Sequence, residues 1–117
     1  MIFDTHAHYD DEDFDVDREE LLMSLGEAGI GRVLNCAADM ESCASTIALT
    51  RKYPFVYGAV GVHPNEVGEL DEEAFQLLSS YCDEDKIVAV GEIGLDYYWD
   101  ENPDKEIQKS VFRAQMQ

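Results

Sequence analysis

Two histidines separated by one residue form the sequence feature best suited to chemistry. His6 and His8 follow the short apolar segment 1–3 (MIF), which is typical of the start of a buried strand. Alternate residues of an extended chain point to the same side, so both imidazoles can converge on one ion at the end of that strand. Imidazole binds several transition metals, which leaves the metal open. The alternative interpretation is a pair of solvent-facing histidines in a polar loop.

Two further candidate ligands follow later apolar segments. His63 lies in residues 61–64 (GVHP) and could bind metal, contact a substrate phosphate or move a proton. Glu92 lies in residues 91–96 (GEIGLD), where neighbouring glycines allow close approach of backbone and ligand. Its two oxygens could bridge two metal ions, or backbone donors of a tight turn could satisfy them. All three histidines of the chain thus follow predicted strands, which favours a functional site over chance.

Other potentially functional segments are less specific. Residues 10–20 carry eight carboxylates, but a calcium loop starting at Asp11 would need Gly at Val16 and Glu at Leu22. We therefore expect a solvated loop and helix start. The aromatic residues 97–99 (YYW) could stack on a base or sugar, or cover the rim of the fold. The sequence contains no phosphate-binding glycine loop and no serine-nucleophile motif.

The elements that must position these residues alternate as strand and helix. The predicted strands are 1–5, 32–37, 55–61 and 86–90, and the predicted helices are 17–28, 39–52, one starting at Asp71 and one running from Asn102-Pro103 to the last residue. This alternation is typical of parallel βαβ construction. A small open sheet and the first half of an eight-stranded barrel both fit. Because the chain ends inside an amphipathic helix, we predict an α/β fold in which residues 1–117 form one domain, the first half of a (β/α)8 TIM barrel.

Apolar periodicity predicts which faces are buried. The strand at 86–90 is short, apolar and β-branched, so we expect it to be buried on both faces. The inward positions of the predicted helices are Leu21, Leu22, Leu25 and Ala28 in the first, Ala44, Ile47 and Ala48 in the second, Ala74, Leu77, Leu78 and Tyr81 in the third, and Ile107, Val111 and Ala114 in the fourth.

Composition narrows the class of protein. With 45% hydrophobic and 29% charged residues, the chain fits a globular protein, and it has neither a membrane-length apolar run nor a signal-peptide pattern. We therefore expect a cytoplasmic protein without a membrane partner. Its net charge of −18 disfavours nonspecific nucleic-acid coating, because that relies on basic residues. Three widely spaced cysteines predict reduced, mostly buried thiols.

Three segments together resemble a known family. Residues 3–9 (FDTHAHY), 61–65 (GVHPN) and 91–98 (GEIGLDYY) resemble, in order and spacing, the signatures of TatD-type deoxyribonucleases in the amidohydrolase-like superfamily. The resemblance implies a TIM barrel that hydrolyses DNA, single-stranded DNA in particular, with one or two divalent metals (Mg, Mn or Zn). It makes His6 and His8 ligands of the first metal and Glu92 the carboxylate shared between metals. His63 and Asp96 become candidate catalytic residues, His63 beside the substrate phosphate.

The resemblance also exposes what this sequence lacks. An eight-unit barrel needs about twice this length, and the family's remaining ligands, two histidines and a late aspartate, have no counterpart here. The site implied by the resemblance is therefore incomplete in this chain. One alternative is a non-catalytic half-barrel that associates with itself or a partner through its open strand edges. Another is hydrolysis of amides, lactones or phosphotriesters, because a fold alone does not fix a substrate.

Overall fold

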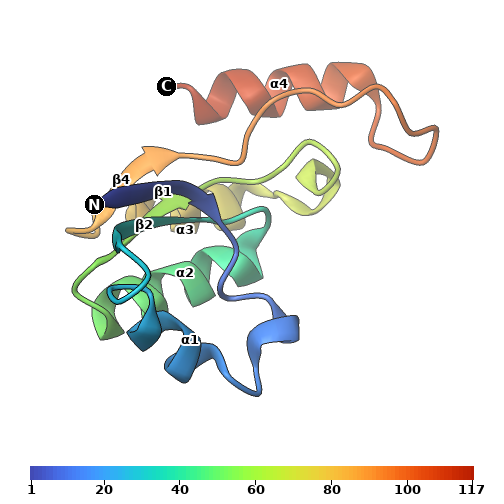
Figure 1. The fold of residues 1–117 in the computed structure, drawn as a ribbon. Coiled ribbons are helices and arrows are strands. Elements are labelled where there is room, and N and C mark those ends of the chain that lie inside the picture. Colours follow the sequence, from blue (N-terminus) through green and yellow to red (C-terminus); the bar gives the residue numbers. More distant parts are fainter.

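Four parallel strands alternate with helices along the whole chain in the computed structural model, which describes residues 1–117 (Figure 1). The elements are β1 (Ile2–Ala7), a 3-10 turn η1 (Glu12–Phe14), α1 (Arg18–Ser24), β2 (Ile30–Cys36), α2 (Met40–Lys52), β3 (Val56–Val60), a 3-10 turn η2 (Val67–Glu69), α3 (Glu72–Tyr81), β4 (Ile87–Val90) and α4 (Lys105–Gln115). The strands form one sheet in the order β1-β2-β3-β4. The predicted order of strands and helices is therefore confirmed.

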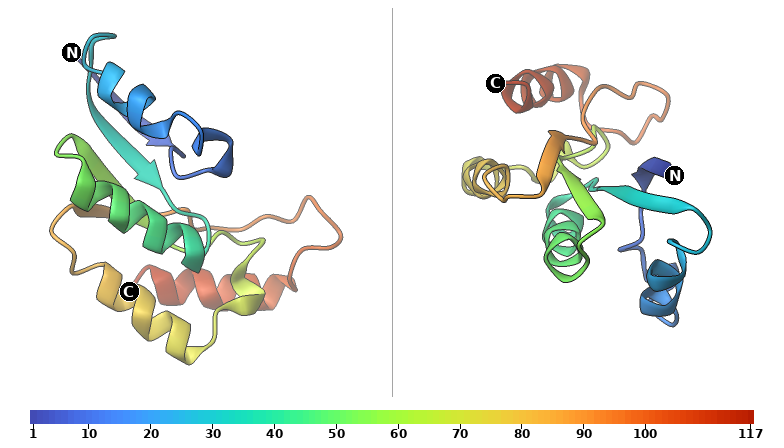
Figure 2. Two further views of the ribbon diagram at one scale, coloured as in Figure 1. Left: turned by 90° about the horizontal axis from the view of Figure 1, so that it is seen from below. Right: turned by 60° about the vertical axis from the view of Figure 1, so that its left-hand side comes forward.

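The helices follow one another around one side of a curved sheet. The right-hand view of Figure 2 shows the strands side by side on the inside of the curve, with α1, α2, α3 and α4 on the outside. The loops that follow the strands all leave the sheet at one end, on the right in Figure 1. This arrangement brings the segments after β1, β3 and β4 to the same end of the sheet, where active sites of parallel α/β folds lie.

Two apolar clusters hold the helices to the sheet. One contains Ala37, Cys43, Ile47, Val60, Val62, Val67 and Leu78. The other contains Leu22, Leu25, Val33, Leu49, Tyr53 and Val56. Between them, α2 lies close to β3 because Gly58 has no side chain: a Cβ there would stand 2.7 Å from the Thr46 methyl. Thr46 and Thr50 are consequently buried.

Capping side chains and one glycine explain where the observed helix boundaries agree with the predicted ones and where they differ. Asp39 caps α2 by accepting from the backbone N–H of Ser42, and Asp71 caps α3 in the same way through Ala74. The predicted helix 17–28 ends early, at Ser24, because turns leading to Gly29, with φ +85°, replace its last residues. The last helix starts at Lys105 rather than at Asn102-Pro103 because Asp104 is its cap.

Several predicted buried faces were wrong. Ala44 and Ala48 are exposed, because α2 turns Cys43, Thr46, Ile47 and Thr50 towards the sheet. Ile107 is 48% exposed, and the fully buried positions of α4 are Gln108 and Gln115. In β4, Val88 and Val90 are 57% and 44% exposed and Ala89 is exposed as well, because this strand lies at the edge of the sheet. Ala28 and Leu77 are exposed as well.

The cysteines largely follow expectation. All three are free thiols; Cys36 and Cys43 are buried and Cys82 is exposed. Burial raises the pKa of the Cys43 thiol to about 11, so this group stays protonated at neutral pH. None of the helices has the length and apolar character required to cross a membrane.

Candidate metal centre

The ends of the first and last strands meet at one cluster of metal-ligating side chains. His6 lies inside β1, which extends one residue past it, so the strand is longer than predicted. In the sheet order, β1 and β4 are separated by two strands, which would put them roughly 14 Å apart in a flat sheet. Glu92 nevertheless reaches the histidines. Curvature of the sheet and the path of the chain after β4 bring the two edges together.

Three ligand atoms lie within a space that suits one ion. His6 Nε2 is 2.7 Å from Glu92 Oε1 and 3.1 Å from His8 Nε2, and His8 Nε2 is 3.3 Å from Glu92 Oε1. Zinc-type ions bind nitrogen and oxygen ligands at about 2.0–2.2 Å, which places neighbouring ligands roughly 3–3.5 Å apart in a tetrahedral site. The two imidazoles and one carboxylate therefore fit a divalent metal in both chemistry and spacing.

Glu92 reaches the cluster because the chain crosses over Gly61. After β4 the backbone passes so close that a Cβ on Gly61 would lie 2.9 Å from the carbonyl carbon of Gly91. Beyond the crossing, the backbone N–H of Glu92 donates to the carbonyl of Ala37, at the end of β2, at 2.6 Å. The absence of a side chain at Gly61 thus allows a residue from one edge of the sheet to face residues from the other.

A backbone carbonyl of β2 orients the ring of His8. Its Nδ1–H donates to the carbonyl oxygen of Cys36 at 2.8 Å. A carbonyl oxygen only accepts, so Nδ1 carries the proton and Nε2 presents a lone pair to the cluster. Metal-binding histidines commonly have such a partner on the second nitrogen. His8 therefore has the tautomer that a metal ligand requires.

A fully buried amide fixes the chain just after His8. Asn35 accepts from the backbone N–H of Tyr9 at 2.7 Å and donates to the Asp10 carboxylate and the Thr46 hydroxyl at 2.8 and 2.9 Å. Its side chain is inaccessible to solvent. Sequence reasoning missed this residue, although a polar side chain between apolar neighbours of a strand, here Leu34 and Cys36, is a signal for such a role.

His63 faces the cluster from a different side and with a different tautomer. Its Nδ1 accepts from the backbone N–H of Asn65 at 3.2 Å, which leaves the proton of the neutral ring on Nε2. His63 Nε2 lies 4.0 Å from Oε2 of Glu92, the oxygen that faces away from His6 and His8. His63 thus presents a hydrogen-bond donor beside the cluster rather than a fourth ligand.

Asp96 does not join this group. Its carboxylate accepts from the backbone N–H of Tyr98 at 2.9 Å, and it makes no hydrogen bond or ion pair with the three histidines or Glu92. The neighbouring aromatic residues are exposed, with Tyr98 79% and Trp99 53% accessible. The structure therefore brings together four of the five predicted site residues.

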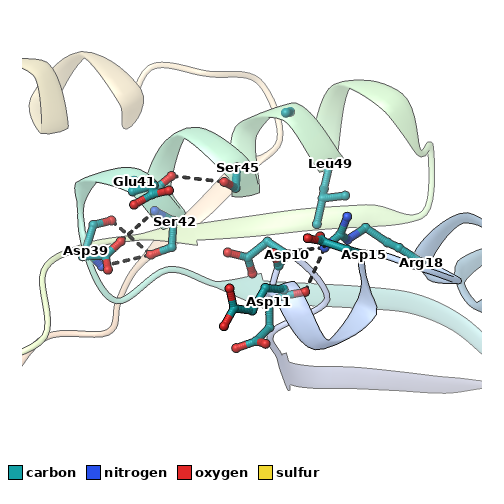
Figure 3. A pocket seen from close by; sticks show the side chains of 11 residues that line it. Asp10, Asp11, Asp15, Arg18, Asp39, Glu41, Ser42, Ser45 and Leu49 are labelled. Carbon is teal, nitrogen blue, oxygen red and sulfur yellow. Dashed lines mark hydrogen bonds and ion pairs between the residues drawn. The ribbon is translucent and has the colours of Figure 1, made fainter.

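An acidic hollow lies between the loop after β1 and the start of α2. Figure 3 shows that Asp10, Asp11 and Asp15 face it from one side and Asp39 and Glu41 from the other. Arg18 is the only basic residue that lines it. The guanidinium donates to the backbone carbonyls of Tyr9 and Asp11 and to the Asp15 carboxylate. Arg18 thereby ties down the loop that follows His8.

The cysteine nearest the cluster is not a thiolate. Burial, and then the charge of the Glu92 carboxylate, raise the pKa of the Cys36 thiol. A protonated thiol is a poor metal ligand, because the thiolate is the form that binds. The donor set of this site therefore consists of imidazole and carboxylate.

Four parallel βα units with histidine and carboxylate side chains gathered at the strand ends are an arrangement suited to a metal-dependent hydrolase, and comparison with known proteins gives the family. The profile of the family described as "TatD related DNase" matches residues 3–117. The chain belongs to this family. The predicted resemblance is therefore confirmed.

Relatives share the sequence along nearly the whole chain. The "Uncharacterized metal-dependent hydrolase YabD" of Bacillus subtilis is 37% identical over 116 residues, which are 99% of this chain and 45% of the relative. The "3'-5' ssDNA/RNA exonuclease TatD" of Cronobacter sakazakii is 29% identical over 82% of this chain and 36% of its own length. The chain thus spans less than half the length of these relatives.

A solved structure supports the fold. The crystal structure of YJJV, a TatD homologue from Escherichia coli K12, superimposes with a TM-score of 0.88 at 33% identity, covering 98% of this chain and 45% of the other. That protein has a TIM barrel fold. The four βα units of this chain are accordingly the first half of a (β/α)8 barrel, as predicted.

Proposed function

We propose that this chain supplies the first part of a divalent-metal site with which a TatD-type hydrolase cleaves phosphodiester bonds of DNA, single-stranded DNA in particular. The observation that carries the proposal is the convergence of His6 Nε2, His8 Nε2 and Glu92 Oε1. A relative named as a 3'-5' ssDNA/RNA exonuclease supports the substrate class.

His6, His8 and Glu92 are the proposed ligands of one or two ions (Mg, Mn or Zn). A bound divalent ion supplies Lewis-acid chemistry, polarising a phosphoryl oxygen and making water more acidic. His8 would present its Nε2 lone pair to such an ion, because the Cys36 carbonyl keeps the proton on Nδ1. Glu92 points one oxygen at His6 and His8 and the other towards His63, as a carboxylate shared between two ions would.

His63 is the proposed residue of the reaction itself, and Asp96, whose carboxylate lies outside the cluster, stays a second candidate on a neighbouring loop. The Nε2–H of His63 is placed to donate to a non-bridging oxygen of the scissile phosphate, and this orients the phosphorus for attack. Asp96 lies on the loop that carries exposed aromatic side chains, which can stack on a base of a single strand. Because the surface is strongly acidic, substrate affinity must come from metal and stacking rather than from basic residues.

Metal content and cleavage of a single-stranded oligonucleotide, measured with each metal and with EDTA, test the proposal. We expect His6→Ala and Glu92→Gln to lose both metal and cleavage. The matched variant His63→Ala should keep its metal and lose cleavage by about 10²-fold. Small amides and lactones serve as control substrates. Unchanged metal content and activity in His6→Ala would show that the proposal is wrong.

A second candidate is a non-catalytic half-barrel that self-associates. The exposed apolar side chains on the edge strands favour it, with Phe3 50% and Val88 57% accessible. Size-exclusion chromatography with light scattering tests this candidate. A dimer that dissociates in Val88→Lys would support self-association, whereas a compact monomer would exclude it.

A further inference from the structure

Two buried glutamines on α4 each bind a backbone segment that carries a proposed site residue. Gln108 is 1% exposed and Gln115 is 7% exposed. They lie seven residues apart, so both project from nearly the same face of the helix. The glutamine carboxamide has the same donor and acceptor as a peptide group, and both glutamines use the two together.

Gln115 holds the residue before His63. Its Oε1 accepts from the backbone N–H of Val62 at 2.8 Å, and its Nε2 donates to the carbonyl of the same residue at 3.1 Å. The last backbone bond between β4 and β3 in this region is the one from Gly91 to Val60. Past that point the chain crosses over Gly61, so β4 no longer pairs with β3. The side chain of Gln115 takes the place of a strand at Val62.

Gln108 holds Asp96 in the same manner. Its Oε1 accepts from the backbone N–H of Asp96 and its Nε2 donates to the carbonyl of Asp96, both at 2.9 Å. The same Nε2 also donates to the carbonyl of Pro103 at 2.8 Å. This contact closes the loop between β4 and α4. By contrast, Gln76 on α3 is exposed and makes no side-chain hydrogen bond.

We propose that Gln115 and Gln108 are positioning residues: α4 uses them to set His63 and Asp96 relative to the metal ligands. Buried amides stabilise a helix less than leucine would, since their desolvation offsets much of the hydrogen-bond energy. Two of them on one face, each bound to both backbone groups of one residue, indicate that the position of the loops matters. The proposal rests on the proposed function, because it assigns these loops a role in the reaction.

The metal-free protein tests the geometry directly. We expect Gln115→Met to displace the imidazole NMR signals of His63, while those of His6 and His8 keep their positions. Gln76→Met is the matched control and should move none of them. Gln115→Glu, which keeps the shape but turns an acceptor towards the Val62 carbonyl, should also displace His63. It serves as the second variant if Gln115→Met does not fold.

The metal-loaded protein tests the consequence for the reaction. We expect Gln115→Met and Gln108→Met to lower kcat by about tenfold through misplacement of reacting groups, with KM and Mn²⁺ affinity within about twofold of wild type. A general loss of stability would instead weaken Mn²⁺ binding and move all three histidine signals. Unmoved His63 signals and unchanged kcat in a folded Gln115→Met would overturn the inference. If wild type neither binds Mn²⁺ nor cleaves DNA, the proposed function fails, while the NMR comparison still decides the geometry.

Discussion

The segment that carries His6 and His8 and the segment that carries Glu92 contribute to one cluster but are held in different ways. The first is supported by its neighbouring strand, through the Cys36 carbonyl and the buried Asn35. The second leaves the sheet, crosses Gly61 and is secured by the carbonyl of Ala37. Side chains at the end of a regular strand are supported by the adjacent strand, whereas a side chain carried across the sheet depends on the close backbone crossing at Gly61. The two segments should therefore respond differently to substitution.

The largest loss of stability is expected at Gly61, because the backbone after β4 passes too close to leave space for a side chain there. Gly61→Val should cost about 3 kcal/mol, because its side chain would overlap the backbone of Gly91. Metal affinity should fall with it, since Glu92 is displaced. Gly26→Ala is the control: nothing lies within 4 Å of the added methyl, so it should stay within about 0.5 kcal/mol of wild type. Urea unfolding and Mn²⁺ titration measure both, and a stable, metal-binding Gly61→Val would contradict the crossing.

A smaller effect is expected at the first segment. Asn35→Leu leaves the Tyr9 N–H and the Thr46 hydroxyl without their partner, which should cost about 1–3 kcal/mol. His6 should retain its place in β1, so metal affinity should fall less than in Gly61→Val. Gln76→Leu, at an exposed position of α3 away from the cluster, is the control. Equal losses of metal affinity in Gly61→Val and Asn35→Leu would mean that the two segments are not held differently.

The smallest expected effect is a change in the rate at which a thiol reagent labels the two buried cysteines, one beneath each segment. Cys36 lies under the first segment, and the Cys43 thiol donates to the carbonyl of Gly61 under the second. Since burial raises the pKa of the Cys43 thiol to about 11, this thiol stays protonated near neutral pH and reacts slowly. A disulfide reagent should therefore modify exposed Cys82 first. Asn35→Leu should speed labelling of Cys36 only, and Gly61→Val that of Cys43. Rapid labelling of Cys43 in wild type would contradict its burial.

The elements, and the positions of His6, His8, His63 and Glu92 at one end of the sheet, could be predicted from the sequence, because both follow from short-range patterns. Strand periodicity puts His6 and His8 on one side, and parallel topology brings Glu92 and His63 to the same end. The supporting residues escaped prediction, because Gln115 acts on Val62 at a separation of 53 residues. The exposure of Ala44 and Ile107 escaped as well, since apolar spacing cannot reveal that buried Thr and Gln side chains take the inward face.

The sequential strand order has a consequence for how the protein is made. Each strand pairs with the one that precedes it in the chain, so the sheet can grow unit by unit as the polypeptide emerges from the ribosome. The contact between His6 and Glu92 spans 86 residues and cannot form until β4 has been synthesised and has crossed back. Assembly of the proposed metal site should therefore be a late event in biosynthesis, and a nascent chain that stops before residue 92 should lack one of the three proposed ligands.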